Sequence, residues 1–246
     1  MKLYKGYSLT YLKEYQFYFN EHISDEFNIM VSDNIEIPNI NESIERISID
    51  GRSGDLIIKN GTYQDREINL KCKIVDMEAF WSQWDEINNW LTNIEDNKLF
   101  IDRDDRYYKV KYVEVGTIKK NTNKDGEFTI KFIVDPFLYD ESGESVSIKT
   151  KNEFNINNFC DFEVEPVFKI FGTGNINVNV NGEEFTIKNI NEYIIVDSNK
   201  MLCYKETTNM LSNMFGNFPV LKIGTNKIKL DGNITKVIVN WESKYR

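Results

Sequence analysis

The sequence contains a single histidine, His22, among 246 residues. Histidine is the usual general base in Ser-His-Asp and Cys-His catalysis, and groups of histidines form many catalytic zinc sites. One histidine therefore excludes a multi-histidine metal centre and leaves few routes to enzyme chemistry.

Cysteine is also scarce. Cys72, Cys160 and Cys203 are odd in number and widely spaced, and none belongs to a Cys-x-x-Cys pair. This spacing indicates neither a zinc site nor a redox motif. We expect three reduced, mostly buried thiols, because free cysteine behaves as a small apolar side chain.

Long apolar runs and an excess of positive charge are both absent. No stretch approaches the roughly 18 apolar residues of a membrane-spanning helix, and residues 1–20 lack the apolar core of a signal peptide. Lys and Arg total 30 against 39 Asp and Glu, for a formal net charge of -9. We therefore expect no membrane insertion and no sequence-specific nucleic-acid binding, since duplex binding needs a basic footprint.

What the sequence does contain is a strong β pattern. Hydrophobic residues make up 41% of a chain long enough for one large all-β domain or two ordinary domains. Apolar and polar residues alternate over 68–74, which predicts a half-buried strand. Turn signals at Lys124–Gly126, Asn181–Gly182 and Asp231–Gly232 each predict a β-hairpin.

One segment breaks this pattern and predicts an amphipathic helix over residues 76–94. Asp76 is the expected N-cap, and Glu78 lies in the first turn, where the helix dipole favours an acid. Trp81 and Trp90 flank the stripe; we expect them to pack on a sheet, with a subunit contact as the alternative. The apolar stripe consists of Phe80, Trp84, Ile87, Leu91 and Ile94.

A polar, turn-rich stretch after Pro136 predicts a domain boundary. Pro136 is expected to close the preceding strand, because proline cannot donate to a β-ladder. The predicted organisation is an N-terminal extension over 1–15, a first domain over 16–140, a linker over 141–158 and a second domain over 159–246. Short, evenly spaced strands in both halves favour a sandwich or jelly roll.

Three patterns suggest chemistry without completing a motif. Asp102, Asp104 and Asp105 lack the glycine and terminal glutamate of a calcium loop, so a charged turn is expected. Gly172-Thr173-Gly174 lacks the third glycine of a dinucleotide fingerprint. Paired carboxylates such as Glu183–Glu184 leave glycosidase chemistry open, but no spacing selects one pair.

An ordered set of short motifs runs through residues 16–246. Gly51-Arg52-Ser53-Gly54 is similar to a Gly-Arg-Asp-Gly turn, with Ser53 in place of the usual Asp. With the segments around it, the sequence resembles the distal tail protein family of long-tailed phages and prophages. Residues 1–15 lie outside this resemblance. The motif residues, which the resemblance makes structural, are Phe19, Asn20, Gly51, Arg52, Gly54, Trp90, Leu91, Asp102, Tyr107, Tyr108, Pro136 and Phe137.

The resemblance implies a mainly β protein. It implies an N-terminal β-sandwich-like domain with one α-helix and hairpins, and a C-terminal galectin-like or jelly-roll β-sandwich. It also implies a structural hub protein that is located at the phage tail tip and is synthesised in the bacterial host cytoplasm. It implies no catalysis, no catalytic or metal-binding residues and no cofactors.

The same resemblance implies several partners. Six copies would form a ring that joins the tail tube protein to a tail-associated lysin or tail fibre hub. The C-terminal domain would hold receptor-binding proteins of the adsorption apparatus.

The alternative is a carbohydrate-binding adhesin that acts through the C-terminal sandwich. Trp241 and the region of Tyr193 and Tyr204 would then stack on sugars. Packing inside the sandwich is the expectation for these aromatic residues, because large aromatic side chains are mostly buried. A fold alone does not establish such a function.

Overall fold

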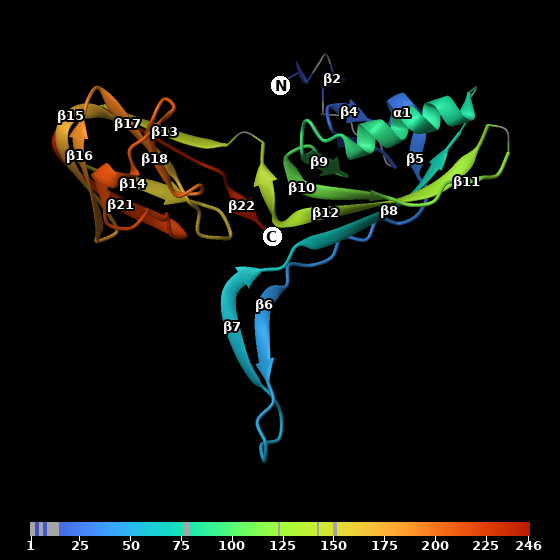
Figure 1. Ribbon diagram of the computed structural model, residues 1–246, viewed down its shortest axis with the longest axis horizontal. Coiled ribbons are helices and arrows are strands. Elements are labelled where there is room, and N and C mark those ends of the chain that lie inside the picture. Colours follow the sequence, from blue (N-terminus) through green and yellow to red (C-terminus); the bar gives the residue numbers. More distant parts are fainter. Residues whose placement is uncertain are drawn as a thin grey trace. The chain divides into compact units, whose positions relative to one another are not determined.

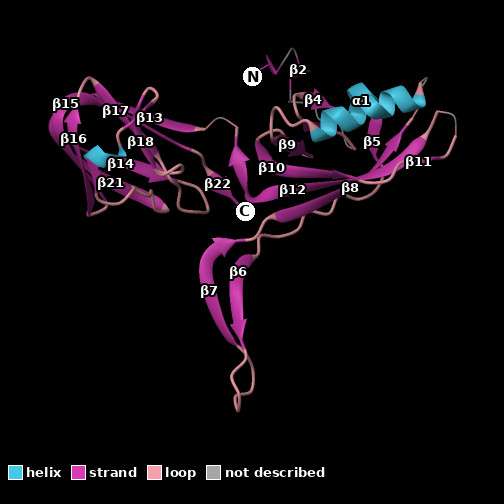
Figure 2. Cartoon of the chain, viewed as in Figure 1, coloured by secondary structure: helices cyan, strands magenta, loops and turns pink. Residues whose placement is uncertain are grey.

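The computed structural model describes residues 3–4, 7–8, 15–75, 79–122, 124–141, 143–149 and 152–246. The described chain is mainly β with a single α-helix, which confirms the expected fold class (Figures 1 and 2). It divides into two compact units, residues 1–139 with Arg246, and residues 140–245. Among the described residues, no helix is long and apolar enough to cross a membrane.

The first unit is organised by one antiparallel sheet with the order β4-β3-β9-β10-β12-β8-β5, and β11 pairs with β12. A 3-10 turn, η2 (Ser24–Phe27), precedes β5, and β1 (Leu3–Tyr4) pairs separately with β2 (Tyr7–Ser8). The strands of the sheet are β3 (Phe17–Phe19), β4 (His22–Ile23), β5 (Ile29–Val31), β8 (Arg66–Ile74), β9 (Lys98–Ile101), β10 (Arg106–Val115), β11 (Lys119–Lys120) and β12 (Gly126–Asp140).

Helix α1 (Phe80–Thr92) packs its apolar stripe against this sheet. The ring of Trp84 meets Phe128 of β12 edge-on at 5.0 Å between centroids. Trp90 is buried, whereas Trp81 is 59% exposed. The buried helix residues are Phe80, Trp84, Ile87, Trp90 and Leu91.

The helix is shorter than the apolar periodicity predicts. Its N-cap is Ala79, without a side-chain cap, and the predicted cap Asp76 and first-turn Glu78 lie outside the described residues. The helix ends at Thr92, where the N–H of Asn93 donates to the Asn89 carbonyl at 2.9 Å. Ile94 therefore lies beyond the helix, because the chain after Asn93 turns away toward Asn20.

A two-stranded hairpin, β6 (Glu42–Ile47) with β7 (Leu56–Tyr63), leaves the sheet of the first unit between β5 and β8 in the sequence. We call residues 42–63 the arm; its tip is the turn over residues 48–55 (Figure 1). These two strands pair with each other and with no other described strand. Every residue of β7 except Tyr63 is exposed.

The second unit is a sheet with the order β13-β21-β15-β17-β18-β19, joined by β14 on β21, β16 on β15 and β20 on β16. Its strands enclose one apolar core that includes Phe168, Val178 and Phe185, as a β-sandwich requires. Its elements are β13 (Glu144–Lys149), β14 (Glu153–Asn158), β15 (Val167–Val180), β16 (Glu183–Ile190), β17 (Tyr193–Asp197), β18 (Leu202–Lys205), β19 (Thr208–Asn209), η3 (Leu211–Asn213), β20 (Met214–Phe215), β21 (Gly224–Trp241) and β22 (Lys244–Tyr245).

The stretch expected as a linker, 141–158, instead supplies strands β13 and β14, which both pair with β21. Val146 and Phe154 pack against the core of the second unit, and Ile156 is buried in it. In β14 the exposed Asn155 and Asn157 alternate with Phe154 and Ile156, as in a half-buried strand, whereas Asn158 is buried.

Two of the three predicted hairpins form. Asn181 and Gly182 join β15 to β16 with φ of 55° and 96°, as a type I′ turn requires. β11 pairs with β12 in antiparallel fashion, with Lys120 opposite Gly126, so the chain reverses direction between them.

The third predicted hairpin, at Asp231–Gly232, is wrong, because β21 continues through it. Gly232 has a φ of 118° and lies where the register between β15 and β21 shifts, so it forms a bulge. A Cβ at this position would lie 2.6 Å from the Asn175 carbonyl oxygen, which explains the glycine without a turn.

Pro136 likewise lies inside β12 and does not close it. Its carbonyl oxygen accepts a hydrogen bond from the Arg66 side chain. The strand therefore continues past a residue that has no N–H to donate.

Candidate functional site

Asn20 joins the β3–β4 turn to the end of α1. Its side-chain Nδ2 donates to the carbonyls of Trp90 and Asn93, both at 2.8 Å. Its Oδ1 accepts from the backbone N–H groups of Glu95 and Asp96 at 2.8 and 3.0 Å. All four bonds are specific to an amide, and the φ of 47° at Asn20 is one that asparagine tolerates.

Trp90 makes the second link between these segments. Its Nε1 donates to the Phe19 carbonyl at 3.0 Å. Its ring stacks on Phe27 with 4.4 Å between centroids and on Phe17 with 5.8 Å. Leu91 beside it is fully buried. The structure therefore brings the motif residues Phe19, Asn20, Trp90 and Leu91 together.

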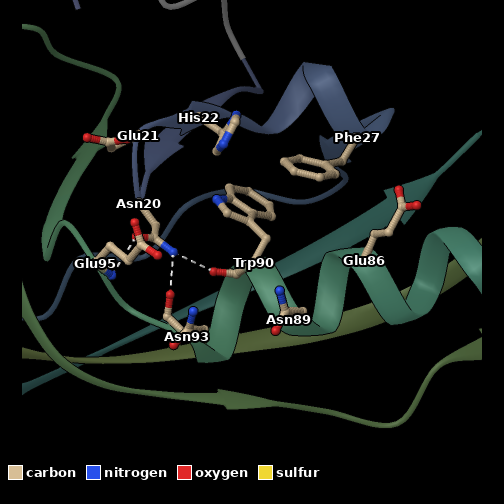
Figure 3. A pocket seen from close by; sticks show the side chains of 9 residues that line it. All are labelled: Asn20, Glu21, His22, Phe27, Glu86, Asn89, Trp90, Asn93 and Glu95. Atoms are coloured by element: carbon tan, nitrogen blue, oxygen red, sulfur yellow. Dashed lines mark hydrogen bonds between the residues drawn. The ribbon is translucent and has the colours of Figure 1, made fainter. Parts of the chain in front are cut away.

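A cavity of about 350 Å³ opens beside this junction (Figure 3). We call it the α1 pocket. Three of its lining side chains are carboxylates, and none is a lysine or an arginine. His22 on its wall forms a hydrogen bond between its Nδ1 and Glu26 Oε2 at 2.7 Å. The lining residues are Asn20, Glu21, His22, Phe27, Glu86, Asn89, Trp90, Asn93 and Glu95.

The motif residues Tyr107, Tyr108, Pro136 and Phe137 gather at a second place in the first unit. Tyr107 stacks on Tyr139 at 5.9 Å, and the rings of Phe137 and Tyr139 meet edge-on at 6.5 Å. These rings form a small aromatic core on the β10 and β12 strands.

A charged network lies next to this aromatic core. Lys111 pairs with Asp65 at 2.6 Å and with Asp135 at 2.9 Å, and Asp135 also accepts from the Tyr139 hydroxyl. Burial would raise the pKa of Asp135, but Lys111 and Tyr139 hold that pKa below its ordinary value. The network therefore favours the charged form of a half-buried carboxylate.

Arg66 anchors the root of the arm. Its side chain is buried, with Nε donating to the Pro136 carbonyl at 2.5 Å and Nη1 to the Pro38 carbonyl at 3.4 Å. Its guanidinium lies 5.5 Å from the centre of the Tyr108 ring. Burial lowers the pKa of Arg66. The arginine thus ties the chain entering the arm, at Pro38, to the chain leaving it.

The arm tip carries the remaining glycine motif. The Arg52 N–H donates to the Ile49 carbonyl at 3.1 Å, and Gly51 between them has a φ of 78°. Positive φ at this turn position requires glycine or asparagine. Gly54 has a φ of 84°. The Arg52 side chain is exposed.

Asp102 begins the turn between β9 and β10 with a φ of 54°. Arg103 binds both carboxylate oxygens of Asp105 at 2.7 Å, so the charges of these two side chains neutralise one another. Within the described part of the chain, no three His, Cys, Asp or Glu side chains gather as metal ligands. The charged-turn interpretation therefore describes this segment.

The three cysteines are buried and free, as expected. Burial raises the pKa of Cys72 to about 12 and that of Cys203 to about 11. Burial also raises the pKa of Cys160. Because the thiolate is the reactive form, these thiols are poor nucleophiles at neutral pH.

The aromatic residues considered for sugar stacking lie differently from one another. Trp241 is in the core of the second unit, 5% exposed. Tyr193 is half-buried, with the Lys169 and Lys205 ammonium groups 4.8 and 5.1 Å from its ring centre. Tyr204 is also half-buried. Packing inside the unit accounts for Trp241, as expected.

A cavity of about 310 Å³ lies elsewhere in the second unit, between β16 and the segment after β20. Its polar lining includes Glu183, Glu184 and Lys222. No aromatic ring named for sugar stacking lines this cavity.

Sequence reasoning missed two features of the first unit. Leu56, Ile57 and Ile58 are 38%, 55% and 40% exposed on the arm. Three consecutive apolar residues break the alternation of a half-buried strand. This break was the sequence signal that could have indicated an exposed apolar surface. Arg66 gave no signal, because a lone arginine after a strand is ordinarily exposed.

Comparison with known proteins supplies the remaining evidence. Residues 19–134 match the family described as phage tail protein RIFT-related domain. No curated protein sequence matches the chain. The crystal structure of the phage SPP1 Dit (gp 19.1) protein, called a paradigm of the hub adsorption apparatus in phages infecting Gram-positive bacteria, is similar with a TM-score of 0.66. It is 12% identical, over 94% of this chain and 99% of that chain.

A chain of the phage p2 baseplate, in its activated conformation with Sr, matches with a TM-score of 0.44. It is also 12% identical, over 87% of this chain and 92% of that chain. The family match and the SPP1 likeness confirm the resemblance drawn from the sequence motifs. Residues 19–134 therefore form a phage tail protein RIFT-related domain, and the fold of the chain is that of a siphophage distal tail protein.

Proposed function

We propose that this protein is a structural hub of a phage or prophage tail tip, in which several copies close a ring that joins the tail tube to the adsorption apparatus. The family match over residues 19–134 and the fold shared with SPP1 Dit support this role. Six copies are expected from the resemblance, with head-to-tail contacts that close on themselves.

The arm is the observation that carries the proposal. An isolated two-stranded hairpin is marginally stable in water, and exposed strand edges invite pairing with other chains. The arm nevertheless exposes Leu56, Ile57 and Ile58. A neighbouring copy in a ring would cover this apolar surface and hold the hairpin in one conformation.

The role proposed is structural and not catalytic. The one histidine forms a hydrogen bond with Glu26, and burial keeps the cysteine thiols protonated. The proposed partners are the tail tube protein, a tail-associated lysin or fibre hub, and receptor-binding proteins held by the second unit, which we propose is galectin-like. The proposed location is the tail tip of the virion.

The test is the oligomeric state of the full chain, measured by light scattering and electron microscopy. We expect a closed ring of six for the natural sequence. Ile57→Asp should dissociate the ring, because it places a charge on the surface that the neighbour covers. Lys229→Asp, on an exposed strand position of the second unit, is the control and should leave the ring intact.

A chain that stays monomeric at every concentration would contradict the ring. Specific binding of the full chain to glycans, without assembly, would instead support the adhesin alternative.

A further inference from the structure

The α1 pocket has the chemistry of a cation site. Its lining includes three glutamates and three asparagines, whose oxygens accept hydrogen bonds, together with Phe27 and Trp90 (Figure 3). Carboxylates form their strongest paired bonds with a guanidinium, whose five N–H donors match two acceptors at once.

The carboxylates of Glu86 and Glu95 are available for such a ligand. Both side chains are exposed on the rim, and neither forms an ion pair or side-chain hydrogen bond with another residue of the described structure. The backbone around them is held in place, since Asn20 accepts from the Glu95 N–H and α1 carries Glu86. The backbone that carries these carboxylates is therefore fixed before any ligand arrives.

Arg52 is the complementary group. It is exposed at the arm tip, and its guanidinium forms no ion pair, hydrogen bond or ring contact with any residue in the part of the chain that the structure describes. Gly51 and Gly54, both at positive φ with open space around them, give the tip a tight turn with little bulk beside Arg52. This shape presents one long cationic side chain ahead of the apolar strand β7.

We propose that Arg52 of one copy binds in the α1 pocket of the next copy in the ring, pairing with Glu86 and Glu95. This inference rests on the proposed ring and names the site that receives the arm. The apolar residues of β7 supply contact area, and Arg52 fixes where the arm ends on its neighbour.

Charge reversal on both sides tests the pairing in the full chain. Arg52→Glu should weaken self-association by about tenfold or more, as expected for a hydrogen-bonded charge pair. Glu86→Arg should weaken it by a similar factor. The double variant, with both reversals, should recover part of the loss, because the new carboxylate at the arm tip then pairs with the new guanidinium, while Glu21 and Glu95 still line the pocket. Association is measured by analytical ultracentrifugation.

Two reversals outside the proposed contact serve as controls. Lys229→Glu reverses a charge on an exposed strand position of the second unit, and Asp85→Arg changes a neighbouring acid on α1 that does not line the pocket. Both should leave association within about twofold of the natural sequence. Circular dichroism checks that all variants fold, which is expected because every altered side chain is exposed.

The outcomes separate this inference from the proposed function. If Ile57→Asp dissociates the ring while Arg52→Glu does not, the pocket assignment is wrong and the ring stands. If Arg52→Glu weakens the ring and the double variant restores nothing, Arg52 binds another surface, which also overturns the assignment. If neither variant changes association, both the ring contact through the arm and this inference fail.

Discussion

Strands β7 and β8 follow one another in the chain, yet their apolar residues are in opposite environments. Ile68, Leu70 and Cys72 of β8 are at most 1% exposed, because α1 and the neighbouring strands cover them. Ile57 on β7 is 55% exposed. Residue type is the same in both strands, so the difference lies in what covers them. One apolar surface is covered within the chain, and the other is exposed, which is the surface that the proposed ring would cover.

The largest effect should come from removing a buried side chain of α1, the helix that packs on the sheet of the first unit. Trp90→Ala should lower the free energy of unfolding of the first unit by about 3–5 kcal/mol, because a buried ring and its hydrogen bond to Phe19 are both lost. Chemical denaturation followed by circular dichroism measures this. Trp81→Ala, at a 59% exposed position of the same helix, should cost less than about 1 kcal/mol. An equal loss of unfolding free energy for the two tryptophan variants would contradict the comparison between covered and exposed apolar side chains.

A smaller loss should follow when only the hydrogen bonds of the junction are broken. Asn20→Asp replaces the two N–H donations to Trp90 and Asn93 with a carboxylate facing two carbonyl oxygens. We expect a cost of about 2–3 kcal/mol in thermal or chemical denaturation. Asn89→Asp, an exposed residue of the same pocket, is the matched control. A variant as stable as the natural sequence would show that the turn is held by packing alone.

The charged network at the arm root predicts an acid-sensitive contribution. The pKa of Asp135 is lower in the folded chain than its ordinary value, so its stabilisation is complete above the unfolded pKa of about 3.9 and is lost as pH falls through the folded value. Unfolding free energy should therefore drop between about pH 5 and pH 2. Asp135→Asn should flatten this drop and cost about 1 kcal/mol at neutral pH. An unchanged slope of unfolding free energy against pH in this variant would exclude Asp135 as a source of the acid sensitivity.

The smallest effect should come from the arm when copies are kept apart by dilution. Ile57→Ser should change the unfolding free energy of the separated chain by less than about 0.5 kcal/mol, since this side chain is already in water. Ile68→Ser, the same change on the covered strand, should cost more than about 3 kcal/mol. A large cost for Ile57→Ser in dilute solution would mean that the chain covers its own arm.

The sequence predicts the parts of this fold whose cause is local. The alternation of β8, the stripe of α1 and the Asn181–Gly182 turn all depend on residues within one element. Asp231–Gly232 has the same local signal as a hairpin, but pairing with β15 keeps β21 continuous there. The strands in 144–158 were missed for a related reason, because their partner lies some 80 residues later in β21.

The candidate site was predictable as a set of motifs and not as an arrangement. Phe19, Asn20, Trp90 and Leu91 were named from the resemblance, and the structure brings them together across about 70 residues. Which acids line the pocket depends on the direction of α1 relative to the β3–β4 turn, and no local pattern encodes that direction. The arm is exposed because no other part of the described chain covers it. The pattern of residues within one strand carries no information about such tertiary contacts.

The pairing of β3 with β9 has a consequence for the order of events during synthesis. Phe17 pairs with Ile101, so β3, which first pairs with β4, lacks its second neighbour β9 until more than eighty further residues have been made. The arm closes locally, between Ile47 and Leu56, and hairpins of this kind form within microseconds. A ribosome adds about 5–20 residues per second, so the arm can pair seconds before the sheet that carries it is complete. Under the proposed ring, the exposed apolar residues of this hairpin are available to a neighbouring copy before either chain has finished folding.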